Sequence, residues 1–197
     1  MVAKIATVFY DSKNEAKIIF QDTLEKPDQS KDYARKFEDE SFDLIISNPP
    51  YSVKGFLDTL SQSDREKFDL LKQIDSASFD KNNAIECFFV ERTAQLLKEG
   101  GYFALILPVS ILSKGGIYET TREILLSKFD ILSIVGLNSR TFGSTGTQTV
   151  IVFAKKREKE AGDLIKCFIN TEFELKNEFV NDDIIAKYCA FKCFNKD

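Results

Sequence analysis

The chain of 197 residues is 43% hydrophobic and 29% charged, a composition typical of a globular protein with enough apolar side chains for a core. It has no histidine, which excludes Ser-His and Cys-His nucleophiles, His-ligated zinc and histidine general-base catalysis, and none of its nine glycines lies in a dinucleotide-binding or P-loop pattern. Acidic residues outnumber basic ones by 31 to 27, so any contact with nucleic acid must be local or supplied by another segment.

The first part of the chain has two segments with strand patterns, separated by a charged loop. Ala16 to Phe20 is a short β-branched run that ends at an acidic turn, and residues 24–41 are charged and typical of a loop. Phe42 to Ser47 (FDLIIS) predicts a buried strand, which the prolines that follow end abruptly. Residues 52–82 are polar and poorly patterned, a long excursion of the kind associated with function.

The second part alternates helices and strands. A helix is predicted over residues 84–98, closed by Gly100 and Gly101 as a C-terminal cap. The elements predicted after it are a strand at 102–107, a helix at 118–127, a strand at 131–137 and a strand at 147–154. This order predicts an α/β sheet whose central strands are apolar on both faces, with the last two strands antiparallel because only a short loop joins them.

The cysteines and the N-terminus indicate the cellular setting. The four cysteines form no C-x-x-C pair and have no histidine to complete a metal site: Cys87, Cys167, Cys189 and Cys193. The first 17 residues are too polar for a signal peptide, and no run of 18 apolar residues is present. We therefore expect a cytoplasmic protein with reduced thiols and without a metal.

The strongest chemical signal is Asn48-Pro49-Pro50-Tyr51, directly after the FDLIIS strand. A polar residue at the carboxyl end of an α/β strand lies where such sheets bind ligands. The two prolines fix the backbone and remove two N–H donors, so the turn offers acceptors, the Asn48 side-chain oxygen and the Pro49 carbonyl. Two acceptors beside the aromatic ring of Tyr51 suit a planar group with an NH2, such as a nucleobase amine or a primary amide.

This turn and its surroundings resemble the amino-methyltransferases that use S-adenosylmethionine. Over residues 4–157 the pattern is similar to the N6-adenine DNA methyltransferases of restriction–modification systems, particularly type I modification subunits and related fused type II enzymes. Residues 18–24 (IIFQDTL) resemble the third motif of that family, residues 86–107 the segment after the N-P-P-Y turn, and residues 140–149 the start of a late hairpin.

The resemblance implies site-specific transfer of a methyl group to an adenine flipped out of DNA, by direct displacement. It implies that Asn48 and Pro49 bind the target amine, with Pro50 and Tyr51 completing the catalytic turn. Tyr51 and Phe142 would flank the base, and Asp22 and Asn48 would face the cofactor. From the residues alone, Asp22 is equally a plain turn residue and Phe142 equally a core aromatic, and the helix from Glu86 is interpreted as scaffold.

The family also carries a glycine-containing loop and an acidic residue on two strands for which only 17 residues are available before Ile18. We therefore expect a partial Rossmann-like methyltransferase fold, with a mostly parallel sheet, a C-terminal antiparallel hairpin and the first two strands missing. Residues 1–157 would be the C-terminal part of the catalytic domain, and residues 158–197 a linker and the start of a further segment. DNA, a specificity or nuclease subunit, or the missing N-terminal half are the expected partners.

Two alternatives remain open at this stage. Similar N-P-P-Y turns occur in methyltransferases that act on guanine N2 of RNA or on glutamine amides of proteins. The chain could also be a non-catalytic remnant, or a split subunit that needs a partner chain.

Overall fold

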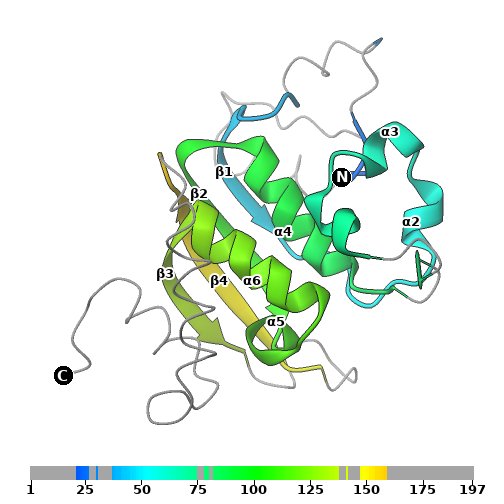
Figure 1. The fold of residues 1–197 in the computed structure, drawn as a ribbon. Helices are drawn as coiled ribbons and strands as arrows, with labels where there is room; N and C mark the ends of the chain where they lie inside the picture. The colour runs from blue at the N-terminus through cyan, green and yellow to red at the C-terminus, as the bar shows by residue number, and fades with distance from the viewer. Residues whose placement is uncertain are drawn as a thin grey trace, which may run out of the picture.

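The computed structural model describes residues 21–26, 30, 37–74, 78–79, 82–137, 141 and 147–158. Its centre is one four-stranded sheet in the order β1-β2-β4-β3, formed by β1 (Phe42–Ser47), β2 (Leu97–Pro108), β3 (Phe129–Gly136) and β4 (Thr149–Lys156). β1 pairs with β2 in parallel, whereas β4 is antiparallel to both of its neighbours, β2 and β3. Consequently β1, β2 and β3 run in one direction and β4 runs against them, as the mixed α/β prediction requires (Figure 1).

Helices α4 (Ile85–Leu96) and α6 (Ile117–Lys128) lie across one face of this sheet, with the short α5 (Ser110–Ser113) before α6 (Figure 1). Every second residue of the two central strands is buried toward these helices: Phe103, Leu105 and Leu107 on β2, and Val150, Val152 and Ala154 on β4. The rings of Phe103 and Phe129 meet edge to face with centroids 4.9 Å apart. The core therefore lies between the helices and this face of the sheet.

Residues 42–47 were predicted to form a buried strand, and that prediction is wrong for the opposite face of the sheet. Leu44 and Ile46 of β1 are 56% and 73% exposed, and Tyr102 and Phe153 extend the same apolar face across β2 and β4. An apolar strand alone does not distinguish burial on two faces from burial on one. Here the described helices cover a single face, and the apolar run on β1 remains open to solvent.

The predicted glycine cap after the first long helix is also wrong. Leu97 adopts an extended conformation and ends α4, and Gly100 and Gly101 lie inside β2. There they form an irregularity in the pairing, because Phe42 pairs with Leu97 while Leu44 pairs with Tyr102. Gly100 takes a φ of 75°, which glycine adopts without strain.

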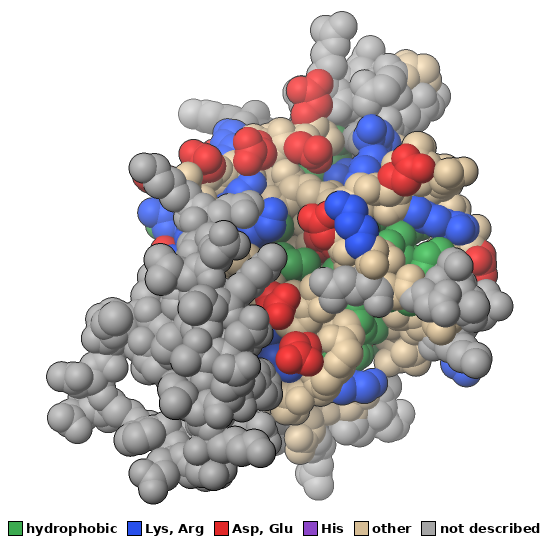
Figure 2. Space-filling view, in the orientation of Figure 1, with side chains coloured by type: hydrophobic (Ala, Val, Ile, Leu, Met, Phe, Trp, Pro, Cys, Tyr) green, Lys and Arg blue, Asp and Glu red, His purple; other side chains and the backbone are tan. Residues whose placement is uncertain are grey.

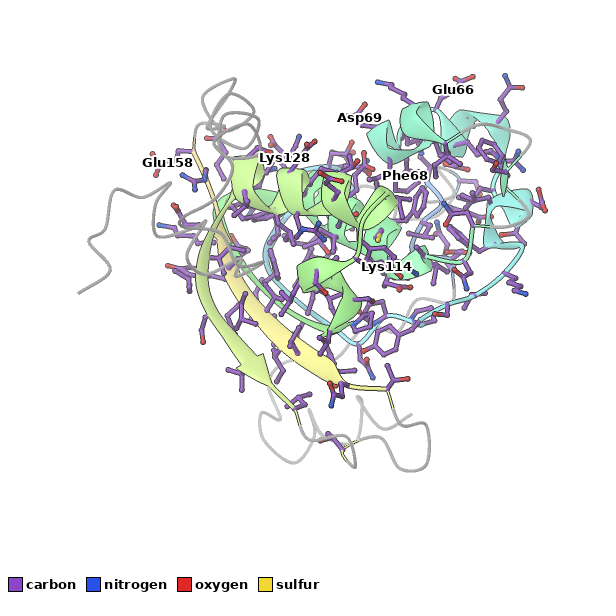
Figure 3. All side chains as sticks on the ribbon, turned by 60° about the horizontal axis from the view of Figure 1, so that its bottom comes forward. Glu66, Phe68, Asp69, Lys114, Lys128 and Glu158 are labelled. Carbon is purple, nitrogen blue, oxygen red and sulfur yellow. The ribbon has the colours of Figure 1, made fainter. Side chains whose placement is uncertain are left out.

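The excursion after β1 folds into short helices, α2 (Phe56–Thr59), α3 (Gln62–Arg65) and the 3₁₀ helix η2 (Asp69–Gln73). Phe56 and Phe68 anchor it on α4, because both rings contact Phe88 edge to face, at 5.1 and 5.3 Å. Phe68 points into the molecule from this segment, whereas Glu66 and Asp69 point outward (Figure 3). No helix in the described ranges has the length and apolarity to cross a membrane.

Candidate functional site

The turn Asn48–Tyr51 leaves the sheet at the carboxyl end of β1. Because β1 and β2 are parallel and Ser47 pairs with Leu105, the turn lies at the edge where the carboxyl ends of both strands meet. Pro49 is buried, while Asn48 is exposed. The Tyr51 hydroxyl donates to the backbone oxygen of Ile106 at 3.0 Å, which fastens the turn to the neighbouring strand. The predicted ligand-binding position is therefore a turn that continues from β1 and is hydrogen-bonded to β2.

Asn48 and Tyr51 lie in contact within this turn. The Tyr51 hydroxyl lies 2.6 Å from Asn48 Oδ1 and shares its one proton between this oxygen and Ile106 O. Burial raises the pKa of Tyr51, and the negative charge of Glu86 raises it further, so the hydroxyl stays protonated and donates. In this arrangement the hydroxyl of Tyr51 binds one lone pair of the oxygen expected to bind a substrate amine, and the second lone pair is left for that amine.

A buried carboxylate that the sequence interpretation assigned to scaffold holds the residue after the turn. Glu86, on α4, is fully buried, and its Oε2 accepts the Ser52 backbone N–H at 3.1 Å. Its Oε1 accepts the Tyr118 hydroxyl at 2.6 Å, and burial, followed by the contact with Glu86, raises the pKa of Tyr118. The signal in the sequence was an acidic residue among apolar ones in the first turn of the helix, Ile85-Glu86-Cys87-Phe88.

Asp22 lies apart from this cluster, in an exposed turn. Its Oδ1 accepts the Leu24 N–H at 2.9 Å and its carbonyl oxygen accepts the Glu25 N–H at 3.3 Å, which is the geometry of a turn residue. The buried guanidinium of Arg92, on α4, donates to the carbonyl oxygens of Thr23 and Glu25 at 3.0 and 3.4 Å. Among the described residues no hydrogen bond joins Asp22 to the Asn48–Tyr51 turn; the two sites share α4 as their support.

Two further predictions cannot be placed. Phe142, expected beside the base, and the Ile18 strand both lie outside the described residues. The described chain reaches residue 158, so the segment predicted to follow the catalytic domain lies outside it as well.

Comparison with known proteins identifies the family. The family model described as N-6 DNA Methylase matches residues 1–190. The methylase subunit of the type I restriction enzyme MpnII from Mycoplasma pneumoniae is 26% identical over 183 residues, which is 90% of this chain and 32% of that protein. The type II restriction enzyme and methyltransferase RM.Eco57I from Escherichia coli is 27% identical over 120 residues, 60% of this chain and 12% of that protein.

Solved structures give the same fold. A chain of a type I restriction–modification system superimposes with a TM-score of 0.55 at 19% identity, and the M protein of the type I restriction enzyme EcoKI with 0.52 at 18%. Each alignment covers 79% of this chain and 28% of the other, so the chain spans about a third or less of the relatives that it matches. The extent of the family match and the shared α/β fold lead to one conclusion: the chain belongs to the N-6 DNA methylase family.

Proposed function

We propose that this chain provides the amine-binding part of an S-adenosylmethionine-dependent DNA methyltransferase that modifies adenine at N6. The observation that carries the proposal is the Asn48–Tyr51 turn, which presents a side-chain amide and an aromatic ring together at the carboxyl edge of β1 and β2. Membership of the N-6 DNA methylase family supports the same chemistry.

The turn suits an exocyclic amine for electronic reasons. The amine of adenine is a weak nucleophile because its lone pair is delocalised into the ring. Asn48 Oδ1 and the Pro49 carbonyl would each accept one N–H, which orients the nitrogen and favours the positive charge that develops on it. Tyr51 would contribute a ring face against which the base stacks. No histidine is required, because the proton can leave the product amine to solvent.

The described residues are chemically compatible with the cofactor. S-adenosylmethionine, when bound, supplies an electrophilic methyl group. Asp22 has one carboxylate oxygen engaged by Leu24 N–H, and among the described residues its other oxygen has no partner, so it can accept from a hydroxyl or amine. Asp22 and Asn48 would hold the group from the side of this chain.

We further propose duplex DNA as the substrate, with the adenine rotated out of the helix before it reaches the turn. The net charge of −4 argues against attraction of DNA by a bulk positive field. Basic and acidic side chains are interspersed on the face seen in Figure 2, which fits that argument. A second subunit, such as one for specificity or cleavage, or further segments of a longer methyltransferase, would then provide most of the DNA contact.

The test combines cofactor binding with methyl transfer. The full chain is titrated with S-adenosylmethionine by calorimetry, then incubated with the labelled cofactor and duplex DNA, and the product nucleoside is identified. We expect N6-methyladenine, lost in Asn48→Ala and retained in Gln62→Ala, which removes an exposed side-chain amide on α3. Parallel incubations replace the DNA with RNA or with protein, and label in either would support the other amino-methyltransferases. Absence of both binding and transfer would support the remnant or split-subunit alternative and overturn the proposal for the chain alone.

A further inference from the structure

The residue that follows the turn has an unusual backbone conformation. Ser52 has a φ of 54°, in the left-handed region that favours glycine, and it is one of two non-glycine residues with positive φ in the described chain. A side-chain-bearing residue keeps such a conformation only when its surroundings determine it, and such residues cluster at functional sites. The chain direction at Ser52 decides where the Tyr51 ring and, through its hydroxyl, the Asn48 amide point.

The interaction that determines this conformation is the hydrogen bond from Ser52 N–H to Glu86 Oε2. Glu86 is fully buried, and within the described ranges no lysine or arginine forms an ion pair with it. Its two oxygens are bound instead by neutral donors, the Ser52 N–H and the Tyr118 hydroxyl. A hydrogen bond to a carboxylate is stronger than one between neutral groups, and burial strengthens it further. The position of the carboxylate is fixed from the far side by Tyr118, whose ring lies under Lys114 Nζ at 4.9 Å.

A purely structural carboxylate on the same helix provides the contrast. Glu91 is also buried, and its two oxygens accept two backbone N–H groups, those of Asp69 at 2.6 Å and Leu70 at 3.1 Å. These donors belong to the start of η2, so Glu91 holds the excursion and not the turn. Glu86 and Glu91 are therefore buried carboxylates of the same helix that each hold a backbone segment, and they differ in which segment that is.

From this geometry we propose that Glu86 is a positioning residue for the amine-binding turn. By holding Ser52 in its left-handed conformation, it fixes the direction of Tyr51 and Asn48 toward the substrate. The effect on methyl transfer rests on the proposed function, whereas the effect on the geometry of the turn does not. Glu86 thus acts through the backbone and does not itself contact the base.

The substitutions separate positioning from stability. Glu86→Met keeps the volume and removes both acceptors. Glu86→Gln keeps an oxygen for Ser52 N–H, and its amide nitrogen can donate to the Tyr118 hydroxyl, which reverses to accept. Glu91→Met is the matched control on the same helix. In the double variant Glu86→Met with Ser52→Gly, glycine adopts the positive φ without strain.

The first measurement is the NMR signal of the Asn48 side-chain amide and of the Ser52 backbone amide in the full chain without cofactor. We expect both to shift in Glu86→Met, to return toward the wild-type position in Glu86→Gln, and to stay in place in Glu91→Met. The Asn48 signal should return in the double variant with Ser52→Gly. Where Glu86→Met does not fold, Tyr118→Phe, which releases one side of the carboxylate, should move the Ser52 signal in the same direction.

The second measurement is methyl transfer. We expect Glu86→Met to lower kcat/KM by roughly 10- to 100-fold, the size of effect that a misplaced reacting group produces, and Glu86→Gln to restore most of it. An unshifted Asn48 signal in Glu86→Met, or an equal shift in Glu91→Met, would overturn the inference. A wild-type chain without transfer would overturn the proposed function and leave the NMR test standing.

Discussion

The hydroxyl of Tyr51 lies 2.6 Å from Asn48 Oδ1, the oxygen proposed to accept the substrate amine. The two residues of the turn are thus partners of each other before any substrate is present. An amide oxygen has two lone pairs, so Asn48 Oδ1 can keep the hydroxyl on one of them and accept the arriving amine on the other. The ring of Tyr51 would therefore stack on the base, while its hydroxyl holds the Asn48 amide in place for the amine.

Replacing Tyr51 separates these effects. Tyr51→Phe removes the hydroxyl that holds Asn48 Oδ1 and keeps the ring, so we expect base binding to weaken by roughly 2- to 10-fold, the worth of one neutral hydrogen bond. Tyr51→Ala removes the stacking face and should weaken binding by roughly 5- to 150-fold. The measurement is the fluorescence of 2-aminopurine placed next to the target adenine in duplex DNA, which rises when the adenine leaves the stack, and the chain has no tryptophan to interfere. Unchanged or tighter binding in Tyr51→Phe would show that the hydroxyl does not assist the amine.

Arg92 is expected to stabilise the segment that carries Asp22. Its side chain is 3% exposed and donates to Thr23 O at 3.0 Å and to Gln95 Oε1 at 3.0 Å. Arg92→Met leaves these part-buried acceptors without their donor, so we expect the free energy of unfolding to fall by about 1–2 kcal/mol in urea denaturation. Amide hydrogen exchange of residues 23–26 should accelerate. Lys98→Met, which removes an exposed ion pair with Asp43, should cost less than about 1 kcal/mol.

Gly101 has no room for a side chain. A Cβ at this position would lie 3.0 Å from Leu97 Cδ2, 3.0 Å from Lys98 O and 3.2 Å from Asp43 O. Two of these neighbours are backbone oxygens, so Gly101→Ala should lower the free energy of unfolding by about 1–3 kcal/mol. Gly115→Ala is the control, because no atom lies within 4 Å of its added Cβ. Thermal unfolding of both variants gives the comparison, and an equal Tm would contradict the close packing of β1 on the β2 irregularity.

The buried thiol of Cys87 should make stability depend on pH in the alkaline range. Burial raises the pKa of Cys87 to about 12, against about 8.5 for an unfolded cysteine. The folded state therefore keeps a proton that the unfolded state loses, so this contribution is complete below pH 8.5 and declines as the pH rises toward 12. At pH 10 the loss is about 2 kcal/mol. Urea unfolding at pH 7 and pH 10 should show a smaller pH effect in Cys87→Ala than in the wild type.

The local pattern of the sequence was sufficient for the presence of the four strands and the two long helices, and for the turn. FDLIIS predicted β1 with its observed bounds, Phe42–Ser47, because the two prolines that follow fix the backbone and lack the N–H donors that pairing needs. Only residues 138–146 separate the last two predicted strands, which is too short for a parallel crossover, and β3 and β4 are antiparallel as predicted. Asn48 and Tyr51 were predicted together because they are three residues apart, and the structure brings them into contact.

Features that depend on residues distant in the sequence could not be predicted in the same way. The exposure of Ile46 depends on which face of the sheet the helices cover, and the apolar sequence of the strand does not indicate which face that is. Gly100 and Gly101 follow a helix, as a cap does, but they serve the pairing of β2 with β1, more than 50 residues earlier. The role proposed for Glu86 depends on its hydrogen bond with Ser52, and the local sequence around either residue does not predict that the two are in contact.

The position of β4 has a consequence for the order of folding. It is the last strand of the described chain, yet it lies between β2 and β3, and each of its long edges is paired. During synthesis the ribosome must therefore release residues up to Lys156 before the described sheet can form, and until then β2 is unpaired on the edge that will receive β4 and β3 has no partner in this sheet. Contacts of high sequence separation slow this step. The last strand added to the described sheet is therefore an internal strand and not an edge strand.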